Sequence, residues 1–140
     1  MGRLLSIDYG RRRTGIAVTD PLRIVASGLT TVPTHTLTQF LKDYMSRETV
    51  DAIIVGLPTD MHGRESESMR YIKPAVGRLK ADFPGVDIIF YDERFTSVLA
   101  HRAMIDGGMK KSERRNNKGI VDEISATILL NDYLQSNQSR

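Results

Sequence analysis

Apolar residues in this chain follow two different spacings, which together predict five strands and four helices. Short apolar runs bounded by glycine, proline or charged residues predict strands, whereas apolar residues spaced three and four apart predict helices. The expected strands are Leu4–Ile7, Gly15–Val18, Arg23–Val32, Asp51–Val55 and Val86–Phe90. The expected helices are Leu37–Met45, Met69–Leu79, Val98–Met104 and Ile120–Leu134.

The order of these elements predicts the fold class. Leu4–Ile7 and Gly15–Val18 flank a glycine-bounded loop, which favours a β-hairpin, and the third strand follows directly. Asp51–Val55 and Val86–Phe90 are continuous apolar runs with a helix between them, as is typical of buried parallel strands. We therefore expect an α/β fold: a mixed sheet of three antiparallel strands followed by two parallel strands, with helices on both faces. The length of 140 residues indicates one domain, residues 1–140.

Three local features refine this expectation. Gly28 indicates a bulge in the third strand. Thr36 or Thr38 is a suitable cap for the first helix. Pro74 lies inside the apolar pattern of the second helix, so we expect either a kink there or a later start of that helix.

The composition excludes several classes of protein. Hydrophobic residues make up 40% and charged residues 26% of the chain, which is typical of a globular domain. There is no cysteine, which excludes disulfides, thiolate catalysis and zinc–cysteine sites. No apolar run is long enough to cross a bilayer, and the first residues lack the pattern of a signal peptide. We therefore expect a cytoplasmic protein with no membrane partner.

Positive charge is concentrated in two segments of a chain whose net charge is only +3. The hairpin loop contains Arg11, Arg12 and Arg13, and Tyr9 beside it is a candidate to stack on a base or sugar. The second segment, Gly108–Lys118, contributes Lys110, Lys111, Arg114, Arg115 and Lys118. Focused positive charge favours a polyanionic partner such as RNA or DNA, although basic loops can also serve solubility alone. We expect the second segment to be mobile in the free protein and to contact phosphate groups.

Acidic residues lie where the strands and the last helix would present them together. Asp8 ends the first strand, Glu93 follows the fifth, and Asp122 lies in the first turn of the last helix. Ligands of open α/β sheets bind outside the carboxyl ends of the strands, and Mg²⁺ and Mn²⁺ prefer carboxylate oxygens. Asp92 and Glu123 also fit the spacing. Because adjacent strand residues point to opposite faces, only one of Asp92 and Glu93 can enter such a site.

Each of the three carboxylates also has a purely structural explanation. Asp8 could be a turn residue, Glu93 could pair with Arg94 on the surface, and Asp122 could stabilise a helix N-terminus. Each of these explanations taken alone is at least as good as a functional one. The joint occurrence of the three in a basic chain favours a functional site.

Four motifs occur in order along the chain. They are Ile7–Asp20, Val55–Pro58 followed by Gly63, Asp92–Ser97 and Val121–Ala126. Together they resemble the YqgF family of ribonuclease-H-like nucleases, also called RuvX-like, over residues 4–134. The resemblance implies a ribonuclease-H-like fold and a metal-dependent acidic site. It places Asp8, Glu93 and Asp122 as the catalytic carboxylates and metal ligands.

The chain departs from the family pattern in the loop Thr59–Gly63 and at Ser125. The loop reads Thr59-Asp60-Met61-His62-Gly63, whereas the family more usually has asparagine and then an acidic residue before the glycine. Ser125 stands where alanine is common. The loop makes Asp60 and His62 accessory candidates, with His62 the one that could move a proton, and Arg94 beside Glu93 is a further accessory candidate.

The chemistry of such a site is phosphodiester hydrolysis with two divalent ions, Mg²⁺ or Mn²⁺. The resemblance implies an endonuclease for structured nucleic acid, with the 5′ end of pre-16S rRNA as the main hypothesis and a Holliday junction as the alternative. A junction needs two symmetric cuts and hence a homodimer, whereas RNA processing is compatible with a monomer. A non-catalytic nucleic-acid-binding module would have no use for the three carboxylates. An actin-like ATPase would need a longer chain to close over ATP.

Overall fold

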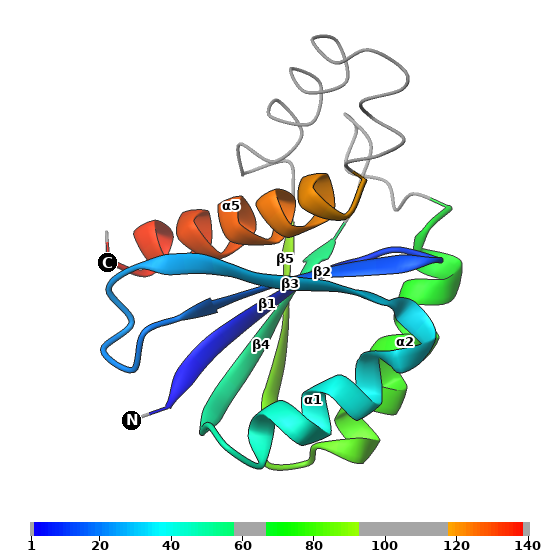
Figure 1. Ribbon diagram of the computed structural model, residues 1–140, viewed down its shortest axis with the longest axis horizontal. Coiled ribbons are helices and arrows are strands. Elements are labelled where there is room, and N and C mark those ends of the chain that lie inside the picture. Colours follow the sequence, from blue (N-terminus) through cyan, green and yellow to red (C-terminus); the bar gives the residue numbers. More distant parts are fainter. Residues whose placement is uncertain (1, 58–66, 93–117, 139–140) are drawn as a thin grey trace, which may run out of the picture.

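The computed structural model describes residues 2–57, 67–92 and 118–138 and arranges them as one sheet between helices (Figure 1). The strands are β1 (Arg3–Tyr9), β2 (Arg13–Thr19), β3 (Ala26–Pro33), β4 (Val50–Leu57) and β5 (Asp87–Asp92). The helices are η1 (Thr34–Thr36), α1 (Leu37–Met45), α2 (Met69–Asp82) and α5 (Lys118–Gln138). The helix expected at Val98–Met104 lies outside the described residues, as does the segment Gly108–Lys118 up to its last residue.

The strands lie in the order β3-β2-β1-β4-β5. β1 pairs with β2, and β2 with β3, in antiparallel fashion, whereas β4 is parallel to β1 and β5 is parallel to β4. Parallel neighbours need a crossover connection, which α1 provides before β4 and α2 provides before β5. The mixed sheet predicted from the sequence is therefore confirmed, with its first three strands antiparallel and its last two parallel.

The alternation of side chains along β1 divides them between the two faces of the sheet. Leu5 and Ile7 belong to the core that α1 and α2 cover, whereas Leu4 belongs to the core under α5. Figure 1 shows α5 along one face of the sheet and α1 and α2 on the other. The same alternation directs Asp8 toward the α5 face and Tyr9 toward the α2 face.

Both cores consist mainly of aliphatic side chains, but their residue sizes differ. The larger core, under α1 and α2, contains Leu5, Ile7, Ile16, Leu37, Leu41, Tyr44, Val50, Ile53, Val55, Met69, Ile72, Val76 and Leu79. The core under α5 contains Leu4, Ala17, Ala26, Ala52, Ile54, Ala126, Leu129, Leu130 and Leu134. Its alanines allow α5 to approach the sheet closely. Among the described helices, none is both long enough and apolar enough to span a membrane.

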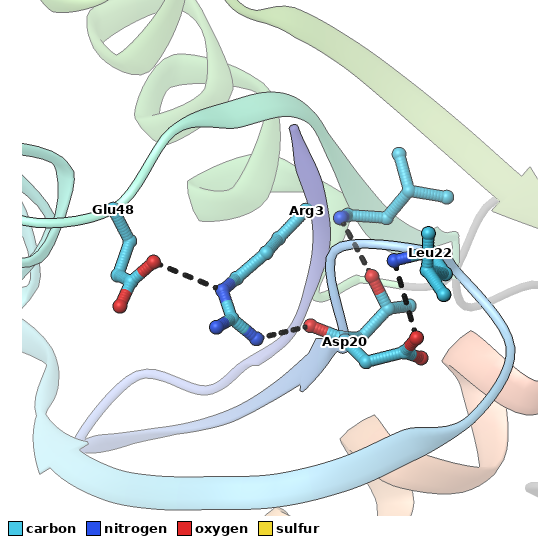
Figure 2. A network of polar contacts seen from close by, with 6 residues as sticks. Arg3, Asp20, Leu22 and Glu48 are labelled. Carbon is cyan, nitrogen blue, oxygen red and sulfur yellow. Dashed lines mark hydrogen bonds and ion pairs between the residues drawn. The ribbon is translucent and has the colours of Figure 1, made fainter. Parts of the chain in front are cut away.

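The third strand begins later than the sequence predicts. The prediction was Arg23–Val32, but β3 begins at Ala26 because the Asp20 carboxylate holds the preceding residues in a turn. It accepts hydrogen bonds from the N–H groups of Leu22 (3.1 Å), Ile24 (2.8 Å) and Val25 (2.8 Å). Figure 2 shows the contact of the Leu22 amide with Asp20. Arg23 within the turn has a φ of 58°, which is incompatible with a strand.

Three further local predictions have mixed outcomes. The bulge expected at Gly28 is confirmed by a shift of the β2–β3 register beside it. Thr36 occupies the N-cap position of α1, as one of the two predicted alternatives, but its hydroxyl donates to the Pro33 carbonyl at 2.7 Å and makes no capping bond to the helix. α2 begins at Met69 and continues through Pro74, which excludes the later start and leaves a kink at Pro74 as the other predicted alternative.

The amino end of β1 is fixed by polar contacts, at the opposite end of the strand from Asp8. Arg3 donates from Nε to a Glu48 carboxylate oxygen at 3.2 Å and from Nη1 to the Thr19 carbonyl at 3.0 Å (Figure 2). These bonds connect β1 to the end of β2 and to the loop before β4. They stabilise the sheet far from the carboxyl ends where the candidate site lies.

Candidate active site

Asp8 and Asp122 are brought together on the α5 face of the sheet. Two residues before Asp8, the buried Ser6 hydroxyl donates to the carbonyl of Ala126 at 2.6 Å, which fixes α5 against β1. Asp8 lies about 6.6 Å further along the strand on the same face. Asp122 lies one turn, about 6 Å, before Ala126 along the helix. Asp8 therefore follows the Ser6–Ala126 hydrogen bond along β1, and Asp122 precedes it along α5.

The contacts of Gly15 show that Asp8 and Asp122 lie on the same side of the Ser6–Ala126 hydrogen bond. It pairs with Asp8 across the β1–β2 ladder. A Cβ atom built on Gly15 would overlap the backbone carbonyl of Asp122, so the first described turns of α5 lie directly on this glycine. Asp8 and Asp122 are therefore both neighbours of Gly15, one beside it in the sheet and one above it. A residue with any side chain at position 15 would separate them.

Arg13 completes this group with a positive charge. Its Nε lies 3.3 Å from Oδ2 of Asp122, and the two side chains are 39% and 26% exposed. The sequence predicts Arg13 only as a contact for nucleic acid, whereas the structure also places it as the partner of a candidate catalytic carboxylate. A cation at this position offsets the repulsion between Asp122 and a neighbouring carboxylate.

The structure shows which member of each adjacent acidic pair, Asp122 or Glu123 and Asp92 or Glu93, is compatible with a site beside Asp8. A Cβ atom on Gly28 of β3 would contact the Glu123 carboxylate, so that side chain lies over β3, two strands away from Asp8. On β5, the Tyr91 hydroxyl bonds to Ser136 of α5, which assigns Tyr91 to the α5 face. The next residue, Asp92, belongs to the opposite face. Asp122 therefore fits a site beside Asp8 better than Glu123 does. Asp92 lies on the opposite face of the sheet from Asp8 and Asp122 and does not belong to this site.

The basic loop between β1 and β2 is held by Thr34. The Thr34 hydroxyl donates to the Gly10 carbonyl at 2.6 Å and lies 2.9 Å from the hydroxyl of Thr14. Its backbone N–H donates to the Arg12 carbonyl at 2.9 Å. Arg11 and Arg12 are exposed on this fixed loop, as the prediction of a nucleic-acid contact requires. Sequence reasoning gave no role to Thr34, because its contacts are distant in the chain.

Tyr9 lies on the other face of the sheet from Asp8. Its ring centroid is 6.1 Å from that of Tyr71 in α2, and the Arg11 guanidinium lies 5.2 Å from the Tyr71 centroid. Tyr9 and Arg11 are thus grouped with α2 and separated from the carboxylates by the sheet.

Several predicted site residues cannot be placed. Glu93, Asp60, His62, Arg94, Lys110, Lys111, Arg114 and Arg115 lie outside the described residues, and Lys118 is described only as the first residue of α5. Within the described residues, no three acidic, histidine or cysteine side chains form a group that could hold a metal ion. A complete metal site on this face would therefore need a ligand beyond Asp8 and Asp122.

Comparisons with known proteins identify the family. A family model described as RuvX, Holliday junction resolvase, matches residues 2–136. A protein of Phocaeicola vulgatus named "Putative pre-16S rRNA nuclease" is 58% identical over 136 residues, which cover 97% of each chain. A protein of Flavobacterium johnsoniae with the same name is 55% identical and covers 97% of this chain and 98% of its own.

A solved structure supports the fold class independently. Thermus thermophilus RuvC in complex with a Holliday junction substrate aligns with a TM-score of 0.62 at 18% identity, covering 99% of this chain and 96% of its own. At this identity the likeness establishes a shared ribonuclease-H-like fold. Taken with the family match over nearly the whole length, it confirms the predicted resemblance: the chain belongs to the RuvX family.

Proposed function

We propose that this protein is a divalent-metal-dependent endonuclease that hydrolyses phosphodiester bonds at the 5′ end of pre-16S rRNA. The observation that carries the proposal is the meeting of Asp8 and Asp122 over Gly15, beside a fixed basic loop. The two residues come from opposite ends of the chain, and no packing requirement brings two carboxylates together. The names of the relatives at 55–58% identity support RNA as the substrate.

The side chains present fit a hard divalent ion. Asp8, Asp122 and Glu93 would hold Mg²⁺ or Mn²⁺, because these ions prefer carboxylate oxygens. When bound, two such ions activate the attacking water and stabilise the leaving oxygen of the phosphodiester. Glu93 is preferred to Asp92 because Asp92 belongs to the face opposite α5.

The chain's own cations would position the substrate. Arg11 and Arg12 are exposed on the loop that Thr34 fixes, so they can bind backbone phosphates without first ordering that loop. Arg13 keeps a positive charge at Asp122 and can also face the phosphate nearest to the carboxylates. Lys110, Lys111, Arg114 and Arg115 are proposed as further phosphate contacts.

The test is cleavage of two substrates at one enzyme concentration, with Mg²⁺ or Mn²⁺. A pre-16S rRNA 5′ fragment and a four-way DNA junction are compared for the wild type, Asp8→Asn and the control Asp87→Asn. Asp87 is exposed at the amino end of β5, so its substitution makes the same chemical change far from the site.

We expect the RNA fragment to be cut by the wild type and by the Asp87 variant. Asp8→Asn should lower the rate at least about a hundredfold, as the loss of one preorganised charge commonly does. Symmetric cleavage of the junction alone, by a dimeric protein, would support the resolvase alternative. Equal rates for the two variants would contradict the proposed site.

A further inference from the structure

A pocket of about 260 Å³ opens on the face of the sheet opposite to the two carboxylates. Tyr9 at the end of β1, Arg11 in the basic loop, His35 in η1 and Arg78 in α2 contribute to its wall. Leu37 and Leu79 are among its apolar lining residues. Its volume lies below the roughly 300–1,000 Å³ of pockets that enclose drug-sized ligands, so it suits a phosphate with its attached sugar.

The charge of the pocket selects an anion. Arg11 and Arg78 approach from two different elements, and none of the described residues that line the pocket carries a carboxylate. The Arg11 guanidinium is held over the Tyr71 ring. A cation–π contact uses none of the N–H donors of the guanidinium, so phosphate oxygens can accept hydrogen bonds from them.

The wall of the pocket is rigid before any ligand binds. Thr34, which also lines the pocket, is bonded to the Gly10 carbonyl and to the Arg12 carbonyl, so η1 and the basic loop form one unit. On α2, Ala75, Arg78 and Leu79 follow the spacing of three and four that places them on one helix face. A preorganised pocket loses less entropy when it binds a ligand.

The basic loop connects this pocket to the candidate active site. Asp8 and Tyr9 are consecutive, yet one faces the carboxylate site and the other faces the pocket. The loop that follows places Arg11 at the pocket and Arg13 at Asp122, so its arginines extend from one face to the other around the end of the sheet. A nucleic-acid strand at the carboxylates could follow this positive track to the pocket.

We propose that this pocket binds a backbone phosphate of the nucleic-acid substrate outside the cleaved bond. The inference deepens the proposed function and rests on nucleic acid being the substrate. It assigns Arg78 and His35, which carry no role in hydrolysis, to substrate binding. It also explains why Tyr9 and Arg11 face away from the carboxylates, since they would hold a second part of the same strand.

Binding without divalent metal separates this inference from cleavage. The affinity of the full chain for the pre-16S rRNA 5′ fragment is measured in EDTA across a salt series, for the wild type, Arg78→Gln and Lys80→Gln. Lys80 is exposed on the same helix but lies two residues on, away from the pocket face, so it controls for the loss of one charge. Thermal melting of both variants confirms that they remain folded.

Arg78→Gln should weaken binding about tenfold, the effect of one charge-assisted hydrogen bond. It should also reduce the slope of log K against log salt by roughly 0.7–0.9, as expected for one lost phosphate contact. Lys80→Gln should change the affinity less than about twofold, because it removes no direct contact. Equal effects of the two substitutions would overturn the proposal.

The second measurement locates the bound phosphate by NMR. Inorganic phosphate and AMP should shift the amide signals of Thr34, Thr38 and Leu79 in the wild type, and Arg78→Gln should abolish these shifts. Shifts with phosphate but unchanged RNA affinity in Arg78→Gln would assign the pocket to a free phosphate compound and overturn its role in binding the strand. Weaker RNA binding by Arg78→Gln, together with no cleavage of either substrate by the wild type, would support the pocket while contradicting the nuclease proposal.

Discussion

Replacing Gly15 by alanine tests the packing that brings the two carboxylates together. A Cβ atom at this position would overlap three backbone atoms, the carbonyl carbon and oxygen of Asp122 and the amide nitrogen of Glu123. Backbone atoms cannot rotate away as a side chain can, so α5 must move off the sheet. The substitution therefore changes the position of Asp122 without changing any proposed catalytic group.

The cost can be estimated from this overlap. Adding one methyl group to a well-packed interior destabilises a protein by about 1–3 kcal/mol. We expect the upper part of that range, because the atoms that would be overlapped belong to the backbone of α5 and no side-chain rotation can make space. For a chain of this length the melting temperature should fall by roughly 3–4 °C per kcal/mol. A displacement of about 1 Å at the carboxylates can lower the cleavage rate about a hundredfold.

Gly77→Ala is the matched control. Gly77 is exposed inside α2, and a Cβ atom there would contact nothing within 4 Å. Alanine is preferred to glycine in a helix by about 1 kcal/mol, so this variant should be slightly more stable than the wild type. Both variants are compared by urea unfolding and by cleavage of the RNA fragment with Mg²⁺. Wild-type stability and wild-type cleavage for Gly15→Ala would refute the close approach of α5 to β2.

Three further predictions concern single groups. Ser6→Ala should destabilise the protein by about 0.5–1.5 kcal/mol in urea unfolding, because a buried hydrogen bond to α5 is lost; no change would argue against that bond. Backbone hydrogen bonds, that of the Val25 amide first, lower the pKa of Asp20 below its ordinary 3.8. Asp20→Ala should therefore reduce stability at neutral pH, and its difference from the wild type should shrink as the pH falls below 3.8 through the folded-state pKa; a constant difference would contradict this. Asp8→Asn and Asp122→Asn should not be additive in cleavage, since ligands of one metal site act as a unit, and a double variant far slower than either single one would separate them.

Much of the fold could be predicted because local pattern and tertiary position agree. The continuous apolar run of β4 is buried between the layers, whereas β5, at the edge of the sheet, is only half-buried. The hairpin loop begins at Gly10, but Gly15 lies inside β2 and serves the contact with α5. The prediction is wrong before β3, where Ile24 and Val25 look like strand residues but are 68% and 54% exposed. Their amide groups are taken by the Asp20 carboxylate, and apolar composition alone does not reveal such a turn.

The candidate site was predicted in part. Asp8 and Asp122 could be chosen from the sequence because one lies at the end of a buried strand and the other near the start of the last helix. The expected first-turn position of Asp122 is wrong, because α5 begins at Lys118 and has no acidic residue in its first turn. The choice of Asp122 over Glu123 needs the rotation of α5 about its axis, which its contacts with Gly15 and Gly28 reveal. The partnership of Arg13 with Asp122 joins residues 109 positions apart and leaves no local signal.

Paramagnetic broadening by Mn²⁺ tests the central claim most directly, because it reports where the ion binds and does not depend on turnover. Substoichiometric Mn²⁺ should broaden the amide signals around Asp8 and around Asp122 together, while signals near Asp87 at the other end of the sheet stay sharp. In Asp8→Asn the broadening around Asp122 should require a much higher Mn²⁺ concentration. Broadening near only one of the two aspartates, or unchanged broadening in the variant, would contradict a shared metal site.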